Sequence, residues 1–311
     1  MQQRPLGTDG PAVSVVGLGC NNFGMAIDAT GARAVVGAAL DAGITHFDTA
    51  EGYGGGQSEE MLGAALGRRR DEVVIASKVL RRPQGVPWRP GDLARRIEEG
   101  CDTTLRRLGT DRVDVYYEHH RDPEAPVDEA VEALDGLVRA GKARFTGCSN
   151  YAPADIRRAA EVSAERGWTA PCAAQLHWNL LARQAEDELV PEARRAGMGV
   201  VPYYPLASGL LTGKYGAGGP YPAGSRFERL PRFSTVATPE NIATVDRLAA
   251  VAESAGHTVG ELAVAWLVAQ PGVASVIVGA TTPEQVRANA RAASWCLDAD
   301  ELAAADRAAP R

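Results

Sequence analysis

Four side chains with complementary acid–base chemistry lie at or just beyond the ends of predicted strands. Tyr53 carries a phenol, whose pKa near 10 makes it a poor proton donor at neutral pH. The ammonium of Lys78 beside it would favour the phenolate and lower that pKa, and the carboxylate of Asp48 would keep the buried ammonium charged. The imidazole of His119 could orient a carbonyl oxygen or share the proton. Together these groups would protonate a carbonyl oxygen while another group delivers hydride.

Each of these residues also has an ordinary structural interpretation. Asp48 could cap the following helix, and Tyr53 could be a loop aromatic packed on the surface. Lys78 could be a solvated strand end, and His119 could be a buried core histidine. The catalytic interpretation depends on convergence, because neighbouring strand–helix junctions would bring all four groups into one cleft.

The elements that must position these residues alternate along the chain. Short β-branched or apolar runs are followed by longer segments of helical periodicity. The predicted strands are Val15–Gly19, Thr45–Thr49, Val73–Lys78, Val113–His119, Ala143–Ser149, Ala173–Leu176, Gly199–Tyr203 and Val273–Val278. The predicted helices are 30–42, 57–68, 91–108, 127–140, 153–165, 186–196, 239–269 and 283–293. Eight strand–helix repeats in about 300 residues favour a (β/α)8 TIM barrel over a doubly wound sheet.

Two further segments complete this predicted architecture. Residues Gln2–Val13 contain Asp9-Gly10 between short extended pieces, which predicts an N-terminal β-hairpin closing the bottom of the barrel. The Gly/Pro-rich segment 213–238 is too long for an ordinary connection and predicts a functional loop over the carboxyl-end face. No low-complexity linker divides the chain, so we expect one domain over residues 1–311.

Composition excludes several classes of function. The net charge is −6, with 33 basic and 39 acidic side chains, which argues against a nucleic-acid partner. No apolar stretch approaches the roughly 18 residues that span a bilayer, and no signal segment begins the chain. The five scattered cysteines have no C-x-x-C spacing, so we expect free thiols in the cytoplasm and no zinc site.

Several motifs then point to a known family. They are Gly43-Ile-Thr-His-Phe-Asp-Thr-Ala-Glu-Gly-Tyr-Gly54, Ala76-Ser-Lys78, Val113-Asp-Val-Tyr-Tyr-Glu-His119, Gly141-Lys-Ala-Arg-Phe-Thr-Gly-Cys-Ser-Asn150, Tyr203-Tyr-Pro-Leu206 and Gly279-Ala-Thr-Thr-Pro-Glu-Gln285. In this order the sequence resembles the aldo-keto reductases, in the branch of the potassium-channel β subunits and related bacterial reductases. The resemblance implies a (β/α)8 barrel, NADPH bound without a Rossmann fold, and reduction of an aldehyde or ketone.

The resemblance also implies a role for each matching residue. Asp48, Tyr53, Lys78 and His119 become the catalytic tetrad. The nicotinamide carboxamide would meet Ser149, Asn150 and Gln175, with the ring on Tyr203. The remaining cofactor contacts would be Gly19, Cys20, Asn21, Pro205, Leu206, Ser208, Leu210, Lys214, Arg226, Gly279, Thr281, Gln285 and Asn289. The substrate pocket would include Asn22, Trp88 and His120.

The sequence departs from the commoner family pattern in two ways. A Lys-Ser pair and an Arg that hold the 2′-phosphate in some branches are replaced by Gly279-Ala280 and Gln285. In the branch of the channel β subunits an Arg of the long loop contributes, and the resemblance implies this role for Arg226 in Gly224-Ser225-Arg226. His120 stands where the family more often has Arg. Because side chains alternate along a strand, we expect only one of His119 and His120 to face the pocket, and the alignment favours His119.

Three alternatives from other classes remain open at this point. A Rossmann enzyme is disfavoured because Asn22 replaces the third glycine after Gly17-Leu-Gly19. A metal-dependent barrel hydrolase could use His46, Asp48, Lys78, His119 and His177. An NADPH-binding regulatory or scaffold protein with slow reductase activity would have the same fold and cofactor site. Neither the carbonyl substrate nor the oligomeric state follows from the sequence, and Lys142 has no role that we can derive.

Overall fold

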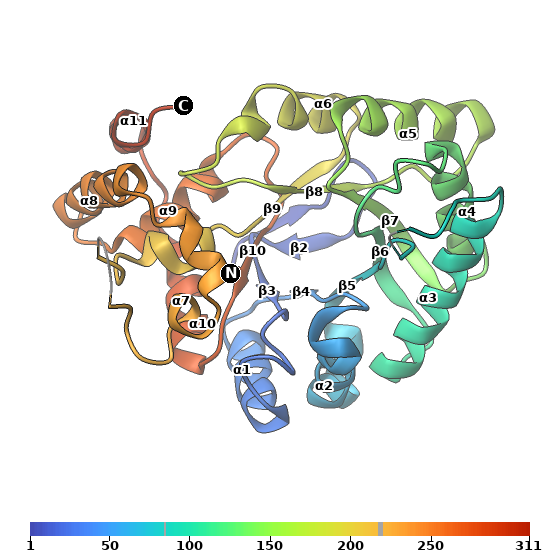
Figure 1. Ribbon diagram of the computed structural model, residues 1–311, viewed down its shortest axis with the longest axis horizontal. Coiled ribbons are helices and arrows are strands. Elements are labelled where there is room, and N and C mark those ends of the chain that lie inside the picture. Colours follow the sequence, from blue (N-terminus) through green and yellow to red (C-terminus); the bar gives the residue numbers. More distant parts are fainter. Residues whose placement is uncertain (84, 217–219) are drawn as a thin grey trace.

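Eight parallel strands form a barrel surrounded by helices in a computed structural model that describes residues 1–83, 85–216 and 220–311. The strands are β3 (Val16–Gly19), β4 (His46–Asp48), β5 (Val74–Val79), β6 (Val113–Glu118), β7 (Ala143–Ser149), β8 (Ala173–His177), β9 (Gly199–Tyr203) and β10 (Val276–Gly279). Their order in the sheet is β10-β3-β4-β5-β6-β7-β8-β9. Val200 and Val273 form a parallel bridge that links β9 to the segment before β10. The predicted (β/α)8 fold is therefore confirmed (Figure 1).

The predicted hairpin is also present, at the end of the barrel where the strands begin. Strands β1 (Gln3–Pro5) and β2 (Ala12–Ser14) pair antiparallel. Leu6 and Val13 are fully buried in one cluster with inward-facing strand residues such as Val115 and Val201. This apolar plug closes the lower end of the barrel by removing those side chains from water.

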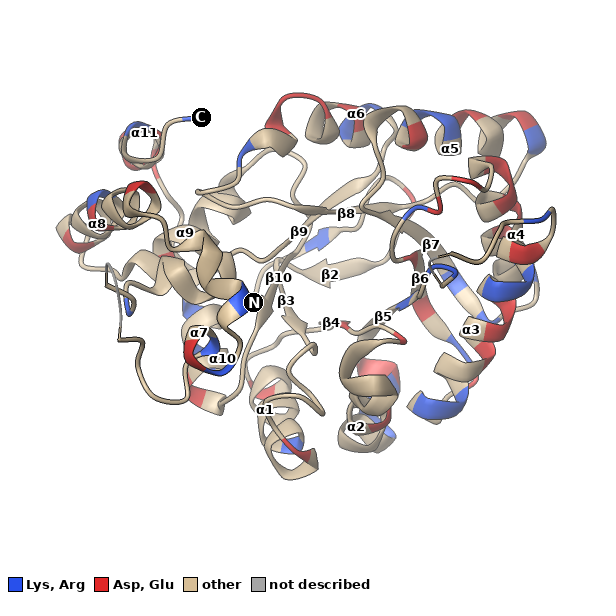
Figure 2. Cartoon of the chain, in the orientation of Figure 1, with Lys and Arg blue, Asp and Glu red and all other residues tan. Residues whose placement is uncertain are grey.

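The helices form the outer ring. They are α1 (Ala29–Asp41), α2 (Gln57–Leu66), α3 (Asp92–Leu108), α4 (Val127–Arg139), α5 (Pro153–Arg166), α6 (Leu189–Arg195), α7 (Arg226–Arg229), α8 (Pro239–Ser254), α9 (Val259–Ala269), α10 (Pro283–Ala292) and α11 (Ala299–Ala308). Charged residues lie mainly on the outer surfaces of these helices (Figure 2). Lys142 pairs with Asp102 of α3 at 2.6 Å, so it ties the turn before β7 to the neighbouring helix. In the ranges that the structure describes, no helix combines the length and apolarity needed to cross a membrane.

Three predictions about elements need correction. The segment 239–269 is two helices, because Gly256 has a φ of +77° and Thr258 caps α9 by accepting from the Glu261 amide. Helix α11 was not predicted, although Asp298 and Glu301 form a capping box at its start. Strand β10 begins three residues later than expected, because Val273 belongs to the separate bridge.

The predicted long loop 213–238 is only partly irregular. Segment 213–238 contains α7 and the 3₁₀ helix η5 (Pro231–Val236), which together lie against the carboxyl end of the barrel. Residues 217–219 of this loop, and residue 84 in the segment before Trp88, lie outside the described residues. Strand β6 ends at Glu118, so His119 and His120 lie beyond the strand.

Candidate active site

The carboxyl ends of the strands surround a cavity of about 810 Å³. Most of the site residues predicted from the sequence line it. They are Gly19, Asn21, Asn22, Asp48, Tyr53, His119, His120, Ser149, Asn150, Gln175, Tyr203, Pro205, Leu206, Ser208, Lys214, Arg226, Gly279, Thr281, Gln285 and Asn289. Residues from the first strand to the last helix of the barrel are therefore brought into one site.

Four predicted residues do not line the cavity: Lys78, Cys20, Leu210 and Trp88. Cys20 and Leu210 are fully buried in the main hydrophobic cluster, so a contact from either to a cofactor is limited to its backbone. Trp88 packs against the same cluster and does not line the cavity. Trp88 does not line the cavity as predicted, because its large indole is instead partly buried against the main hydrophobic cluster.

Lys78 and Asp48 form a buried ion pair at the base of the cavity. The Nζ of Lys78 lies 2.6 Å from Oδ1 of Asp48 and donates to the Thr49 carbonyl at 2.7 Å. Burial lowers the pKa of Lys78, but attraction to Asp48 and Tyr53 outweighs it and leaves that pKa raised. Lys78 is therefore an ammonium at neutral pH, as the sequence predicts.

Gln175 adds a contact that the sequence did not reveal. Its Nε2 donates to Oδ2 of Asp48 at 2.8 Å, so both carboxylate oxygens of Asp48 have partners. The second N–H of Gln175 Nε2 and its Oε1 remain available to a carboxamide. Gln175 therefore supports the Lys78–Asp48 ion pair and is also a candidate cofactor contact, because it lines the cavity.

Tyr53 stands above this ion pair on a short glycine turn. The Nζ of Lys78 is 5.1 Å from the centre of the Tyr53 ring. Burial raises the pKa of Tyr53, and although Lys78 lowers it, the net shift is upward. The expected net lowering is therefore wrong for the free protein, because the loss of hydration exceeds the attraction to one ammonium. The protonated phenol is the stable form, as a proton donor requires.

His119 and His120 both line the cavity. The rings of His119 and Tyr53 meet edge to face at 5.7 Å, and the rings of His119 and His120 stack at 4.6 Å. The expectation that only one of the two histidines faces the pocket is wrong. Strand β6 ends before them, and the alternation of a strand does not apply to the bend that follows.

His119 is neutral over the physiological range. Burial, helped by Lys78 and His120, lowers its pKa from 6.5 to about 2. Its Nδ1 is buried without a hydrogen-bond partner among the described residues. A neutral imidazole at this position can donate from one nitrogen to a carbonyl oxygen.

The lowered pKa of His119 predicts a pH-dependent stability. The unfolded chain binds a proton below pH 6.5 whereas the folded chain does not, so the contribution is fully present above pH 6.5 and declines as the pH falls. Between pH 7 and pH 5, wild-type protein should lose about 2 kcal/mol more unfolding free energy than His119→Asn. Denaturant titrations of both proteins at the two pH values measure this, and equal losses would contradict the assignment.

The predicted nicotinamide contacts are connected to one another. Asn150 donates from Nδ2 to the His119 carbonyl at 2.9 Å and to Ser149 Oγ at 3.1 Å, and its Oδ1 accepts from the Tyr203 hydroxyl at 2.6 Å. Asn150 has a φ of +57°, a conformation that asparagine adopts more readily than most residues. These bonds fix the Tyr203 ring beside the cavity and leave Asn150 little capacity for a direct bond to a carboxamide.

A left-handed backbone segment follows β9. Tyr204, Ala207 and Ser208 have φ values of 54°, 45° and 59°, and Gly209 has a φ of 100°. Non-glycine residues rarely adopt this conformation, and they cluster at functional sites. Successive left-handed residues can turn their amides toward an anion, which suits the predicted pyrophosphate position.

Four cations line the cavity on one segment of the chain: Lys214, Arg226, Arg229 and Arg232. Arg226 donates to Oδ1 of Asn22 at 3.0 Å, and Arg229 donates to the Met25 carbonyl at 3.1 Å. The α7 segment is thus joined across the cavity to the loop after β3. Arg229 and Arg232 were missed, although their proximity to Arg226 in the sequence was an available signal.

The last helix contributes the remaining predicted contacts. Thr282 caps α10 by accepting from the Gln285 amide. The Oε1 of Gln285 accepts from the Thr281 amide at 2.8 Å and from its hydroxyl at 3.1 Å. The exposed N-terminus of α10 therefore adjoins the cavity, where its dipole favours a negative group.

The residues proposed for a metal-dependent hydrolase have other partners. Nδ1 of His46 lies 2.9 Å from the Ser275 hydroxyl beneath the site, and the Asp48 oxygens face Lys78 and Gln175. Among the described residues no three His, Cys, Asp or Glu side chains are grouped as a metal would require. The donor set fits an acid–base site better than a metal site.

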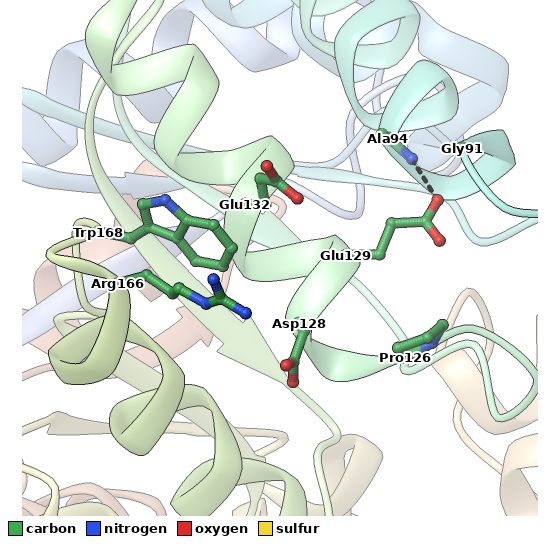
Figure 3. A pocket seen from close by; sticks show the side chains of 8 residues that line it. All are labelled: Gly91, Ala94, Pro126, Asp128, Glu129, Glu132, Arg166 and Trp168. Carbon is green, nitrogen blue, oxygen red and sulfur yellow. Dashed lines mark hydrogen bonds between the residues drawn. The ribbon is translucent and has the colours of Figure 1, made fainter.

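A second hollow lies on the outer ring, between α3, α4 and α5. It is lined by Asp128, Glu129, Glu132, Arg166 and Trp168 among others, and Glu129 reaches across to the Ala94 amide of α3 (Figure 3). None of the predicted site residues lines it. Two of its acidic side chains have local structural roles, since Glu129 caps α3 and Asp128 pairs with Arg158.

The family model described as "Aldo/keto reductase family" matches residues 15–310, nearly the whole chain. The chain belongs to the aldo/keto reductase family. It is 37% identical over 299 residues to a probable voltage-gated potassium channel subunit beta of Oryza sativa subsp. japonica, covering 94% of this chain and 91% of that protein. These matches confirm the resemblance predicted from the motifs.

Bacterial aldo/keto reductase relatives match over similar lengths. The uncharacterized oxidoreductase YrpG of Bacillus subtilis is 34% identical, over 97% of this chain and 94% of that protein. The L-glyceraldehyde 3-phosphate reductase of Escherichia coli strain K12 is 33% identical, over 94% of this chain and 87% of that protein. Family membership and these relatives identify the chain as an oxidoreductase.

Proposed function

We propose that this aldo/keto reductase reduces an aldehyde or ketone to an alcohol with NADPH, and that Tyr53 donates the proton. The observation that carries this proposal is the arrangement of Tyr53 between the buried Lys78–Asp48 pair and neutral His119 at the wall of the cavity. That arrangement supplies a proton donor, a charge to stabilise the phenolate left behind, and an orienting imidazole in one place.

The cavity suits a dinucleotide that would supply hydride when bound. Tyr203 offers a ring held by Asn150, and the left-handed segment offers backbone amides. A Cβ at Gly279 would approach the side chains of Asn21 and Asn22 at 3.4 and 3.3 Å, so glycine keeps this wall open. Four lining cations on a chain of net charge −6 favour a ligand with several phosphates.

The chain's own residues perform the proton chemistry. His119 would donate a hydrogen bond to the substrate carbonyl and hold its oxygen near the Tyr53 hydroxyl. Tyr53 would then transfer its proton to that oxygen as negative charge develops there. Lys78 would stabilise the resulting phenolate, and Asp48 would keep Lys78 charged and in position.

The test is an NADPH-oxidation screen over a diverse panel of aldehydes and ketones, repeated with NADH. The panel includes a phosphorylated triose aldehyde because one relative is named for that activity. Reduction of at least one carbonyl, with alcohol formed in step with NADPH oxidised, supports the proposal. Tight NADPH binding without turnover of any member would contradict it.

Arg226 is the residue we expect to distinguish NADPH from NADH. Replacing it with alanine should raise the dissociation constant of NADPH by about 10-fold or more, since charge-assisted hydrogen bonds contribute roughly 1.5–3 kcal/mol. The NADH constant should change by less than about 3-fold, because NADH lacks the 2′-phosphate. Fluorescence titration with both cofactors measures this, and an equal loss for both would remove Arg226 from the phosphate site.

A second candidate function is suggested by the relatives named as potassium-channel subunits. In that case the chain would bind NADPH, reduce carbonyls slowly and serve a protein partner. A turnover rate far slower than cofactor exchange across the whole panel would favour this alternative.

The five unpaired cysteines, four of them buried, are consistent with the cytoplasm, which we propose as the location.

A further inference from the structure

The turn that follows Tyr53 consists of three glycines, which have no side chains to stabilise it. Residues Gly54, Gly55 and Gly56 have φ values of 58°, 65° and 98°. Glycine tolerates this backbone path but contributes no side-chain contacts and loses the most conformational freedom on folding. The position of the Tyr53 phenol must therefore depend on contacts from neighbouring elements.

Helix α3 supplies such contacts through Glu51, two residues before Tyr53. The Glu51 carboxylate accepts from the Leu80 amide at 3.0 Å and pairs with Arg96 of α3. The Glu51 carbonyl accepts from Nη1 of Arg107, near the end of the same helix, at 3.0 Å. The start of the turn is thus held by side chains more than 40 residues away in the sequence.

Arg107 connects this turn to a fully buried carboxylate. Its Nη1 lies 3.2 Å from Oε2 of Glu59, a residue of α2 with no solvent exposure. The other oxygen of Glu59 accepts from Ser77 at 2.7 Å and from Thr104 at 2.8 Å. Because Ser77 directly precedes Lys78, one hydrogen-bond network joins the Tyr53 turn to strand β5, which carries Lys78.

Arg107 also fills the space under the turn. A Cβ placed on Gly56 would lie 2.4 Å from Cζ of Arg107. The flat guanidinium therefore packs directly against the glycine backbone while it bonds to Glu51 and Glu59. A lysine could place its charge near Glu59, but its single ammonium could not reproduce the packed planar group.

We propose that Arg107 is a positioning residue that holds the Tyr53 turn at the distance needed for proton donation. This inference rests on the proposed function of Tyr53. Proton transfer requires hydrogen-bond geometry between donor and acceptor, and a misplacement of about 1 Å can lower a rate about 100-fold. Arg107 lines no part of the cavity, so its effect on cofactor binding is small.

The experiment compares Arg107→Met, Arg107→Lys and a matched control, Arg106→Met. Arg106 is the exposed neighbour on the same helix and donates to Thr103. Three quantities are measured for each protein: kcat with the best carbonyl of the panel, the NADPH dissociation constant, and hydrogen exchange of a peptide covering residues 50–58. The solvent deuterium isotope effect on kcat is recorded for the two Arg107 variants and wild type.

The expected results distinguish a positioning role of Arg107 from a general structural role. Arg107→Met should lower kcat about 10- to 100-fold, raise the solvent isotope effect, and speed exchange in peptide 50–58. The NADPH constant should stay within about 3-fold, Arg107→Lys should recover part of kcat, and Arg106→Met should match wild type. If Arg107→Met does not fold, Arg107→Lys carries the same test with a smaller loss.

Two outcomes would overturn the inference. One is a kcat within 2-fold of wild type despite faster exchange in peptide 50–58. The other is a parallel loss of kcat and NADPH affinity with an unchanged isotope effect, which would indicate a general structural role. Failure of the proposed function is recognised separately, because wild-type protein would then reduce no carbonyl at all.

Discussion

Replacing Tyr53 with phenylalanine is expected to lower kcat for carbonyl reduction by about 100- to 10,000-fold, the range that general acids contribute. The substitution removes one hydroxyl and leaves the ring that packs against His119 at 5.7 Å. The NADPH dissociation constant should remain within about 3-fold of wild type, because the predicted cofactor contacts lie on other residues. Stopped-flow kinetics and fluorescence titration measure the two quantities.

A matched control for this substitution is Tyr221→Phe. Tyr221 packs edge to face against Tyr215 and Phe227, and its side chain does not line the cavity. The control variant should retain wild-type kcat. Turnover of Tyr53→Phe close to wild type would show that another group supplies the proton, and the mechanism proposed above would have to be abandoned.

Replacing Lys78 with methionine is expected to impair both catalysis and stability. Lys78 has no solvent exposure, and its loss would leave the Asp48 carboxylate buried with Gln175 as its remaining side-chain partner. Removing one member of a buried ion pair typically costs about 3–5 kcal/mol. The loss of the ammonium would also raise the cost of forming a Tyr53 phenolate, so kcat should fall to a level comparable with Tyr53→Phe.

The double variant Lys78→Met with Asp48→Asn separates these two effects. An uncharged amide beside methionine removes the unpaired charge, so unfolding free energy should recover by about 1–3 kcal/mol relative to the single variant. Catalysis should not recover, because neither the ammonium nor its partner is restored. Denaturant titration and kcat measurements test both statements, and recovery of kcat in the double variant would contradict the role given to Lys78.

The amino-acid sequence alone determined the barrel and supplied the candidate reacting groups. Alternating strand and helix periodicity requires only local information, and the ends of β7 and β9 match the prediction residue for residue. The sequence predicted the tetrad because an acid, a phenol, an ammonium and an imidazole lie at or near the ends of neighbouring predicted strands. The family comparisons agree with the barrel fold and with an oxidoreductase.

Which side chains line the cavity also depends on the irregular segments that follow the strands, where the periodic sequence pattern ends. The bend after Glu118 places both His119 and His120 in the cavity, against the alternation expected of a strand. Trp88 packs against the main hydrophobic cluster and does not line the cavity. A side chain's direction at a strand terminus depends on the neighbouring loop, and no periodicity in the sequence encodes it.

Only the tertiary structure determines the pKa values in the site and the long-range contacts that hold its residues in position. The pKa of Tyr53 depends on its burial as well as on Lys78, and burial is a property of the whole fold. The contacts from Arg107 to Glu51 and Glu59 span 56 and 48 residues, and nothing in the sequence pattern pairs them. The sequence by itself therefore determined which chemical groups are present and on which elements, because these follow from local patterns. Distances, desolvation and long-range contacts arise only when all eight strand–helix units close into one barrel.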